Sequence, residues 1–278
     1  MKYTNKLSVF LMSTQKEYLN GDVERCLRKY FENNAPSQYK IDLQITFNKG
    51  KLSEYSGLDF LTKFKNLNNI YISTLNLSGL DDFYAPTPQA MRESSLSSTP
   101  KLGGSTGPNN LFYKSFERFY DLDYRDYLLI ETDSQPATDN WIDKLIDYCD
   151  NNQFLIAGST YKGKQKLPIY EEWTGHLNGI ALYRNSPFLK TFIQESKKLI
   201  EFNINHKINN FISFDVAMHK LYSGLFGRQH CHDPLKPENH LINSPIISNF
   251  SLPIDASTTI ESVKKQYPQT IILHKKWN

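Results

Sequence analysis

The segment Tyr127-Leu128-Leu129-Ile130-Glu131-Thr132-Asp133 joins a short apolar run to two carboxylates, and it carries the strongest signal in the chain. An uninterrupted apolar run of this length is typical of a buried strand. Carboxylate oxygens suit Mg²⁺ or Mn²⁺, which bind one or two protein carboxylates together with phosphates. A turn at the strand end brings Glu131 and Asp133 toward one ligand. The same residues also fit a metal-free turn before Pro136, with Asp133 as its Asx residue.

Around this segment, apolar or alternating runs predict strands, and apolar residues at helical spacing predict helices. The predicted strands are residues 7–12, 41–47, 70–75, 127–130, 154–158, 179–183 and 271–273. The predicted helices are residues 22–31, 111–120, 186–203 and 214–221, and one that follows Asp139 as its N-cap. Strands separated by helices predict an α/β fold with a single, mainly parallel central sheet flanked by helices. No linker separates the halves, so we expect one domain over residues 1–278.

Composition narrows the classes of function. The chain has 278 residues, of which 39% are hydrophobic and 22% charged, which indicates a globular protein and not a disordered one. The net charge of +3 is too small to make nucleic acid or an anionic membrane the expected partner. No apolar run approaches the roughly 18 residues of a transmembrane segment. Three cysteines are an odd number and lie far apart, so we expect no disulfide framework and a cytoplasmic setting.

Ligands of parallel sheets lie beyond the carboxyl ends of the strands. This rule selects Ser13-Thr14 after the first strand, together with Glu131-Thr132-Asp133 after the fourth. His274 follows the last strand, where an imidazole completes a metal site and the lysines at 275–276 neutralise phosphate. A frayed basic tail fits the same residues equally well.

Two further segments carry polar residues of the kind that serve a substrate. His176 and Asn178 precede Gly179 and suit hydrogen bonds to substrate hydroxyls, although an ordinary turn explains them too. Asp215 stands at the start of a helix, where it is either an N-cap or a general base that faces a pocket. There is no GxGxxG after the first strand and no P-loop, so dehydrogenase and P-loop nucleotidase classes are excluded.

Taken together, these residues resemble a GT-A glycosyltransferase over most of the chain. Glu131-Thr132-Asp133 is similar to the DxD-type motif of that class, with Glu in place of the first Asp. The chain more closely resembles a group of bacterial and viral glycosyltransferase-like proteins. The recurring features of that group appear here, in order, as 107–109 before a helix, 131–136 followed by Trp141, 176–179 and 214–217.

The resemblance implies an enzyme that transfers a sugar from a nucleotide-sugar donor to a hydroxyl of a glycan or glycolipid, in the biosynthesis of surface polysaccharides. Residues 1–135 would form the nucleotide-sugar-binding half and residues 136–278 the acceptor-side half. Asp133 would bind a divalent cation, Mn²⁺ or Mg²⁺, with His274 as a further ligand. Glu131 would reach the ribose or the same cation.

The remaining roles follow from the same resemblance. Thr14 would lie by the nucleotide, Asn109 would border the donor site, and Lys275 would lie near the phosphates. His176 and Asn178 would line the sugar or acceptor pocket. Asp215 would be the base, and a single in-line displacement would then invert the anomeric centre.

Two stretches add expectations of their own. Residues 81–110 are rich in Ser, Thr, Pro and Gly, so they are predicted to form a structureless segment that is either a lid or a surface loop. Aromatic residues make up 13% of the chain. Tyr161, Tyr170, Trp173 and Tyr183 flank the His176–Asn178 turn, where aromatic faces suit the apolar side of a sugar ring.

Two rival functions remain open. A sugar nucleotidyltransferase would use a similar sheet and carboxylate pair, but it should carry a Gly-rich, basic loop after the first strand, where Ser13-Thr14-Gln15-Lys16-Glu17 stands instead. A non-catalytic glycan-binding module would keep the fold without the chemistry. The joint presence of Glu131, Asp133, Asp215 and His274 argues against it.

Overall fold

The computed structural model describes residues 2–32, 37–85, 87–94, 100–120, 122–163, 175–226, 236–252 and 257–275. The strands are β1 (Lys2–Ser13), β2 (Tyr39–Phe47), β3 (Leu67–Thr74), β4 (Asp126–Ile130), β5 (Ser134–Pro136), β6 (Ile156–Gly158), β7 (Leu182–Arg184), β8 (Leu241–Asn243), β9 (Ile247–Phe250) and β10 (Ile272–Lys275). The α-helices are α1 (Gln15–Leu19), α2 (Asp22–Phe31), α3 (Pro88–Glu93), α4 (Thr106–Phe119), α5 (Trp141–Asn151), α7 (Pro187–Asn205), α8 (Phe214–Phe226) and α9 (Ile260–Gln266). Short 3₁₀ helices span Leu52–Lys63, Gly79–Asp82, Gly103–Ser105 and Pro237–Asn239.

A seven-stranded central sheet has the order β3-β2-β1-β4-β7-β6-β8. The first four strands in this order are parallel, and β7 runs antiparallel to both of its neighbours. The predicted α/β fold with a mainly parallel central sheet is therefore confirmed. The structure adds a second sheet that the sequence did not predict, with three strands in the order β5-β10-β9.

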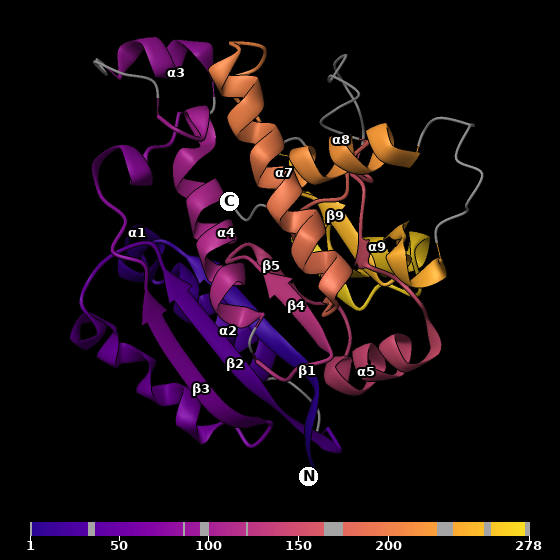
Figure 1. Ribbon diagram of the computed structural model, residues 1–278. Helices are drawn as coiled ribbons and strands as arrows, with labels where there is room; N and C mark the ends of the chain where they lie inside the picture. Colours follow the sequence, from indigo (N-terminus) through magenta and orange to yellow (C-terminus); the bar gives the residue numbers. More distant parts are fainter. Residues whose placement is uncertain are drawn as a thin grey trace.

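Both faces of the central sheet are covered, because side chains on a strand alternate between its two faces. Along β1, Val9 and Leu11 point into a cluster with residues of α2 and α5, while Phe10 joins the opposite cluster with residues of α4 and α7. In Figure 1, α4 and α7 cross one face of the sheet and α2 lies behind it. Phe10 stacks on Phe119 with ring centroids 3.7 Å apart, so part of the large aromatic content forms this second core.

The parallel order of β3, β2, β1 and β4 brings their carboxyl ends to one edge of the sheet. The segments that follow these strands are joined there by hydrogen bonds. The Gln15 N–H donates to Asn48 Oδ1 at 2.8 Å, and Asn48 Nδ2 donates to Asp82 Oδ1 at 2.7 Å. These bonds connect the segments that follow β1, β2 and β3, so these three segments are held together at this edge.

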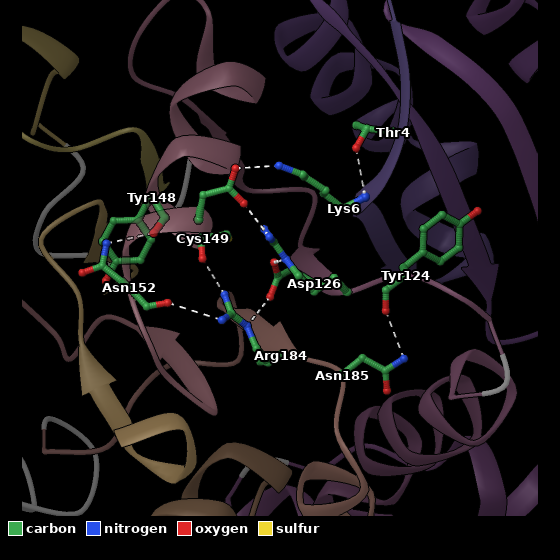
Figure 2. Close-up of polar contacts among 11 residues, drawn as sticks. Thr4, Lys6, Tyr124, Asp126, Tyr148, Cys149, Asn152, Arg184 and Asn185 are labelled. Atoms are coloured by element: carbon green, nitrogen blue, oxygen red, sulfur yellow. Dashed lines mark hydrogen bonds and ion pairs between the residues drawn. The ribbon is translucent and has the colours of Figure 1, made fainter. Parts of the chain in front are cut away.

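The opposite end of β4 is held by a buried carboxylate, shown in Figure 2. Asp126 has a fully buried side chain and accepts hydrogen bonds from Arg125 Nε at 2.6 Å and from Arg184 Nε at 2.7 Å. Arg184 also donates to the carbonyl oxygens of Cys149 and Asn152 (Figure 2). Burial raises the pKa of Asp126 even though the two arginines act to lower it. This cluster fixes β7 against β4 at the first residue of β4, which is the end opposite to the carboxyl edge of the sheet.

Two local predictions are wrong. Asp139 is not the N-cap of α5: Asn140 takes that position, in the left-handed region at φ 55°. Residues 81–110 are not structureless, because α3 lies within them and α4 begins at Thr106. Pro108 is tolerated there because the first turn of a helix leaves its N–H groups without intrahelical partners.

Within the described part of the chain, none of the helices has both the length and the apolar character needed to cross a membrane.

Candidate metal and acceptor site

Three side chains converge at the carboxyl edge of the sheet: Glu131, Asp133 and His274. Glu131 follows β4, Asp133 precedes β5, and His274 comes from β10 near the other end of the sequence. His274 Nε2 lies 3.1 Å from Asp133 Oδ1 and 3.7 Å from Glu131 Oε2. One ligand atom from each residue lies within 4.8 Å of the other two. The structure therefore brings together the three residues that the sequence predicted for the cation and the donor.

The backbone explains why both carboxylates point the same way. A tight turn follows β4, in which the Ser134 N–H donates to the Glu131 carbonyl at 3.0 Å and Ser134 Oγ donates to the same oxygen at 2.7 Å. Tyr30 Oη lies 2.9 Å from Ser134 Oγ and holds this hydroxyl from α2. On the other side, β10 pairs with β5 so that His274 is opposite Ser134, and the Lys275 N–H donates to the Asp133 carbonyl at 3.0 Å.

The electrostatics of the triad favour a cation. Partial removal from water raises the pKa of Glu131 to about 7, helped by the neighbouring carboxylates of Asp133, Asp215 and Glu17, while His274 acts to lower it. Carboxylates crowded in this way repel one another, and a bound cation relieves that repulsion. The two carboxylates suit Mn²⁺ and Mg²⁺ alike, and the imidazole nitrogen favours the transition metal Mn²⁺, so the residues present fit the predicted cation.

A second polar pair consists of His176 and Asp215. His176 Nε2 lies 3.2 Å from Asp215 Oδ2, and both side chains are largely buried. Asp215 Oδ1 accepts hydrogen bonds from Ser213 Oγ and from the Val216 N–H. Burial acts to raise the pKa of Asp215, but the charge of His176 and the hydrogen bonds from His176, Ser213 and Val216 outweigh it and lower the pKa. Asp215 is therefore ionised at neutral pH.

The turn at Asn178 and Gly179 lies between the two groups. A Cβ atom on Gly179 would lie 3.7 Å from Glu131 Oε1 and only 2.5 Å from the ring of Phe214, the residue before Asp215. Asn178 Oδ1 accepts a hydrogen bond from the Ile180 N–H at 3.0 Å, which makes the turn an Asx turn. The triad and the His176–Asp215 pair thus border the same region.

Gly179→Ala is expected to destabilise the protein by about 1–3 kcal/mol, the usual cost of overpacking a filled site. Phe214 has no room to retreat, because its ring stacks on Phe112 with centroids 3.8 Å apart. Urea denaturation measures the change. Gly224→Ala is the matched control, since a Cβ there meets no atom within 4 Å and alanine suits the α8 helix. Equal unfolding midpoints for the two variants would contradict the expected close packing.

The other predicted site residues are placed as follows. Thr14 is the N-cap of α1, at the carboxyl end of β1 as expected, and its hydroxyl lies 2.9 Å from Glu17 Oε2. Asn109 is fully buried, and its Nδ2 donates to the carbonyls of Ile212 and Leu102. It joins α4 to neighbouring loops and has no exposed surface that a nucleotide-sugar donor could contact.

Lys275 is also buried, and its ammonium donates to the carbonyl of Thr258. Tyr183 is fully buried, and its hydroxyl donates to the Gly179 carbonyl at 2.8 Å. It lines a small cavity together with Asn178 and Asp215. Trp173 and Tyr170 lie outside the described residues.

Two residues near the triad were not singled out from the sequence. Glu17 accepts a hydrogen bond from Thr132 Oγ1 at 2.7 Å, and its place three residues after Thr14 is a capping-box signature visible in the sequence. Tyr84 is 61% exposed. Partial burial raises the pKa of Tyr84, and the negative charge of Glu131 raises it further. Nothing in the local sequence marks Tyr84.

No protein-family model and no curated protein matches the sequence. Among solved structures, the apo form of mouse xyloside xylosyltransferase 1 superposes with a TM-score of 0.55 at 12% identity, covering 99% of this chain and 97% of that chain. The apo form of the glycosyltransferase GlyE of Streptococcus pneumoniae gives a TM-score of 0.46 at 14% identity and covers 98% of this chain and 54% of that one. This chain therefore spans about half the length of GlyE. An active-site mutant of LgtC gives a TM-score of 0.49 at 13% identity, covering 98% of this chain and 88% of that chain.

Sequence identities this low are evidence for a similar fold but not for a similar activity. Only the first of these superpositions exceeds a TM-score of 0.5. That match extends over nearly the whole of both chains. In this chain, the sheet has β3, β2, β1 and β4 in parallel order, and an acidic turn directly follows β4. The chain has the fold of the GT-A glycosyltransferases.

Proposed function

We propose that the protein is a cation-dependent glycosyltransferase that moves a sugar from a nucleotide-sugar donor to a hydroxyl of a glycan or glycolipid. The observation that carries this proposal is the convergence of Glu131, Asp133 and His274 at the carboxyl edge of a GT-A fold. Synthesis of surface polysaccharides is the setting that fits such a donor and acceptor.

On the donor side, Asp133 and His274 hold the cation, and Glu131 binds it or the ribose. A bound Mn²⁺ or Mg²⁺ would act as a Lewis acid on the charge that builds on the leaving diphosphate. Thr14 lies at the end of β1, which is adjacent to β4, so it borders the place where the nucleotide is expected.

On the acceptor side, Asp215 takes the proton of the attacking hydroxyl. It is a carboxylate that is ionised at neutral pH, which is the form a general base requires. His176 fixes its orientation through the 3.2 Å contact, and the Asn178–Gly179 turn places this pair beside the triad. Attack assisted by one base in a single displacement inverts the anomeric centre.

The structure disfavours the nucleotidyltransferase alternative. A Gly-rich phosphate loop would have to follow β1 directly, and that position is taken by α1, a short helix closed by a capping box between Thr14 and Glu17. The glycan-binding alternative differs in its products and is separated by the experiment below.

A thermal-shift screen of nucleotide sugars, with and without Mn²⁺, tests the proposal. The correct donor is expected to raise the unfolding temperature only when Mn²⁺ is present, because a ligand that binds the folded state stabilises it by mass action. Incubation of that donor with acceptors then identifies the reaction. A glycosyltransferase releases a nucleoside diphosphate, a nucleotidyltransferase releases pyrophosphate, and a binding module releases neither.

A further inference from the structure

Glu17 contacts two segments that are far apart in the sequence. Its Oε2 accepts hydrogen bonds from the Thr14 N–H at 2.8 Å, from Thr14 Oγ1 at 2.9 Å and from Ser13 Oγ at 2.9 Å. Its Oε1 accepts a hydrogen bond from Thr132 Oγ1 at 2.7 Å. One carboxylate thus joins the segment after β1 to the segment after β4.

Helix capping explains only half of this arrangement. A capping box needs the glutamate to accept from the N–H of the cap residue, which Oε2 does at Thr14. The bond from Thr132 to Oε1 adds nothing to the cap. It reaches across from β1 to β4, which are neighbouring parallel strands with Leu11 opposite Ile130.

Thr132 is the residue between Glu131 and Asp133. Its hydroxyl bonds to Glu17, so a residue outside the triad holds the centre of this turn. Glu17 also acts on Glu131 through its negative charge. Groups behind the ligands of a metal site orient those ligands and tune their affinity.

We propose that Glu17 is a positioning residue, which holds the Glu131-Thr132-Asp133 turn in its cation-binding geometry through the Thr132 hydroxyl. Through its bonds to Thr14, Glu17 also connects that turn to the end of β1. The cation site is thereby linked to the segment after β1, where the nucleotide is expected. This inference rests on the proposed function, because it assumes that the triad binds a cation.

The test measures Mn²⁺ affinity of the full chain by electron paramagnetic resonance, without any donor or turnover. Glu17→Ala and Thr132→Val are each expected to weaken Mn²⁺ binding about 10–100-fold, the range for losing a group that orients a ligand. Thr132→Ser keeps the hydroxyl and is expected to restore most of the affinity. Glu24→Ala is the matched control, since it removes an exposed glutamate of α2 paired with Arg28.

The double variant Glu17→Ala/Thr132→Val separates positioning from a general loss of structure. If Glu17 acts through Thr132, the double variant binds Mn²⁺ no more weakly than the worse single variant, because the two substitutions remove one interaction. Losses that multiply, or wild-type affinity in Thr132→Val, overturn the inference. Thr132→Val alone decides the matter if Glu17→Ala fails to fold. A wild-type protein that binds no Mn²⁺ overturns the proposed function itself, whereas wild-type binding with unaffected variants overturns only the role of Glu17.

Discussion

Asp133→Ala is expected to lower the affinity for Mn²⁺ by more than about 100-fold, beyond the loss seen when only an orienting group is removed. Asp133 Oδ1 lies 3.1 Å from His274 Nε2, so it is the carboxylate oxygen closest to the imidazole of the triad. Without it, only one carboxylate and one imidazole remain. Mn²⁺-dependent binding of a nucleoside diphosphate is expected to disappear with the metal, as measured by isothermal titration calorimetry.

The fold of Asp133→Ala is expected to remain intact. Asp133 adds to the repulsion on Glu131, so its loss relieves strain in the metal-free protein. The contacts that shape the turn come instead from Ser134, from the Thr132 hydroxyl and from the backbone of β10. Asp139→Ala serves as the control, because it removes an exposed carboxylate from the next loop, between β5 and α5. Nucleotide binding that persists in Asp133→Ala, or that EDTA leaves unchanged in the wild type, would remove the basis of the metal site.

The parts of the fold that could be predicted are those encoded in continuous patterns. The apolar run of β4 and the alternation along β2 each identify a strand within a few residues. Once the strands are parallel, their carboxyl ends must meet at one edge. This rule selected Ser13-Thr14 and the acidic turn from the sequence, and in the structure Thr14 and Thr132 both bond to Glu17.

The second sheet could not be predicted, for a physical reason. β10 was predicted as a strand at residues 271–273, but β5 has only three residues, which is too short for a periodic pattern to emerge. Their pairing joins residues on opposite sides of the sequence, and it depends on the packing of the whole domain. Yet this sheet carries His274 to Asp133. The candidate metal site therefore depends on a strand pairing that no local pattern in the sequence predicts.

In the glycine-rich stretch the prediction was wrong in the other direction, because ordered structure was present where none was expected. Gly103, Gly104 and Gly107 suggested a structureless segment, but their lack of a side chain permits close packing. A Cβ on Gly104 would lie 2.4 Å from the Ala85 carbonyl oxygen, and one on Gly103 would lie 2.3 Å from that of Asn210. Composition alone does not distinguish a glycine that loosens a chain from one that lets two segments touch.

Asp215→Asn is expected to lower kcat by about 10²–10⁴-fold, the contribution of a general base, and to leave the affinity for the donor close to wild type. Asparagine keeps the shape of the side chain but takes up no proton at neutral pH. Because the pKa of Asp215 is lowered, the base is already ionised throughout the neutral range, and the wild-type rate should fall on the acid side only below the ordinary range for aspartate. Initial rates of nucleoside diphosphate release across pH measure both effects.

The role of Asp215 as the base also predicts the stereochemistry of the product, which rate measurements alone do not test. One base and one displacement require the product to have the inverted anomeric configuration, which proton NMR of the product reads directly. Asp59→Asn is the control, since Asp59 is an exposed carboxylate in the 3₁₀ helix Leu52–Lys63. A product with retained configuration would show that Asp215 does not act as the base of a single displacement. Its bond to His176 would then be explained as support for the wall of the acceptor site, and His176→Gln should weaken acceptor binding without changing the pH dependence.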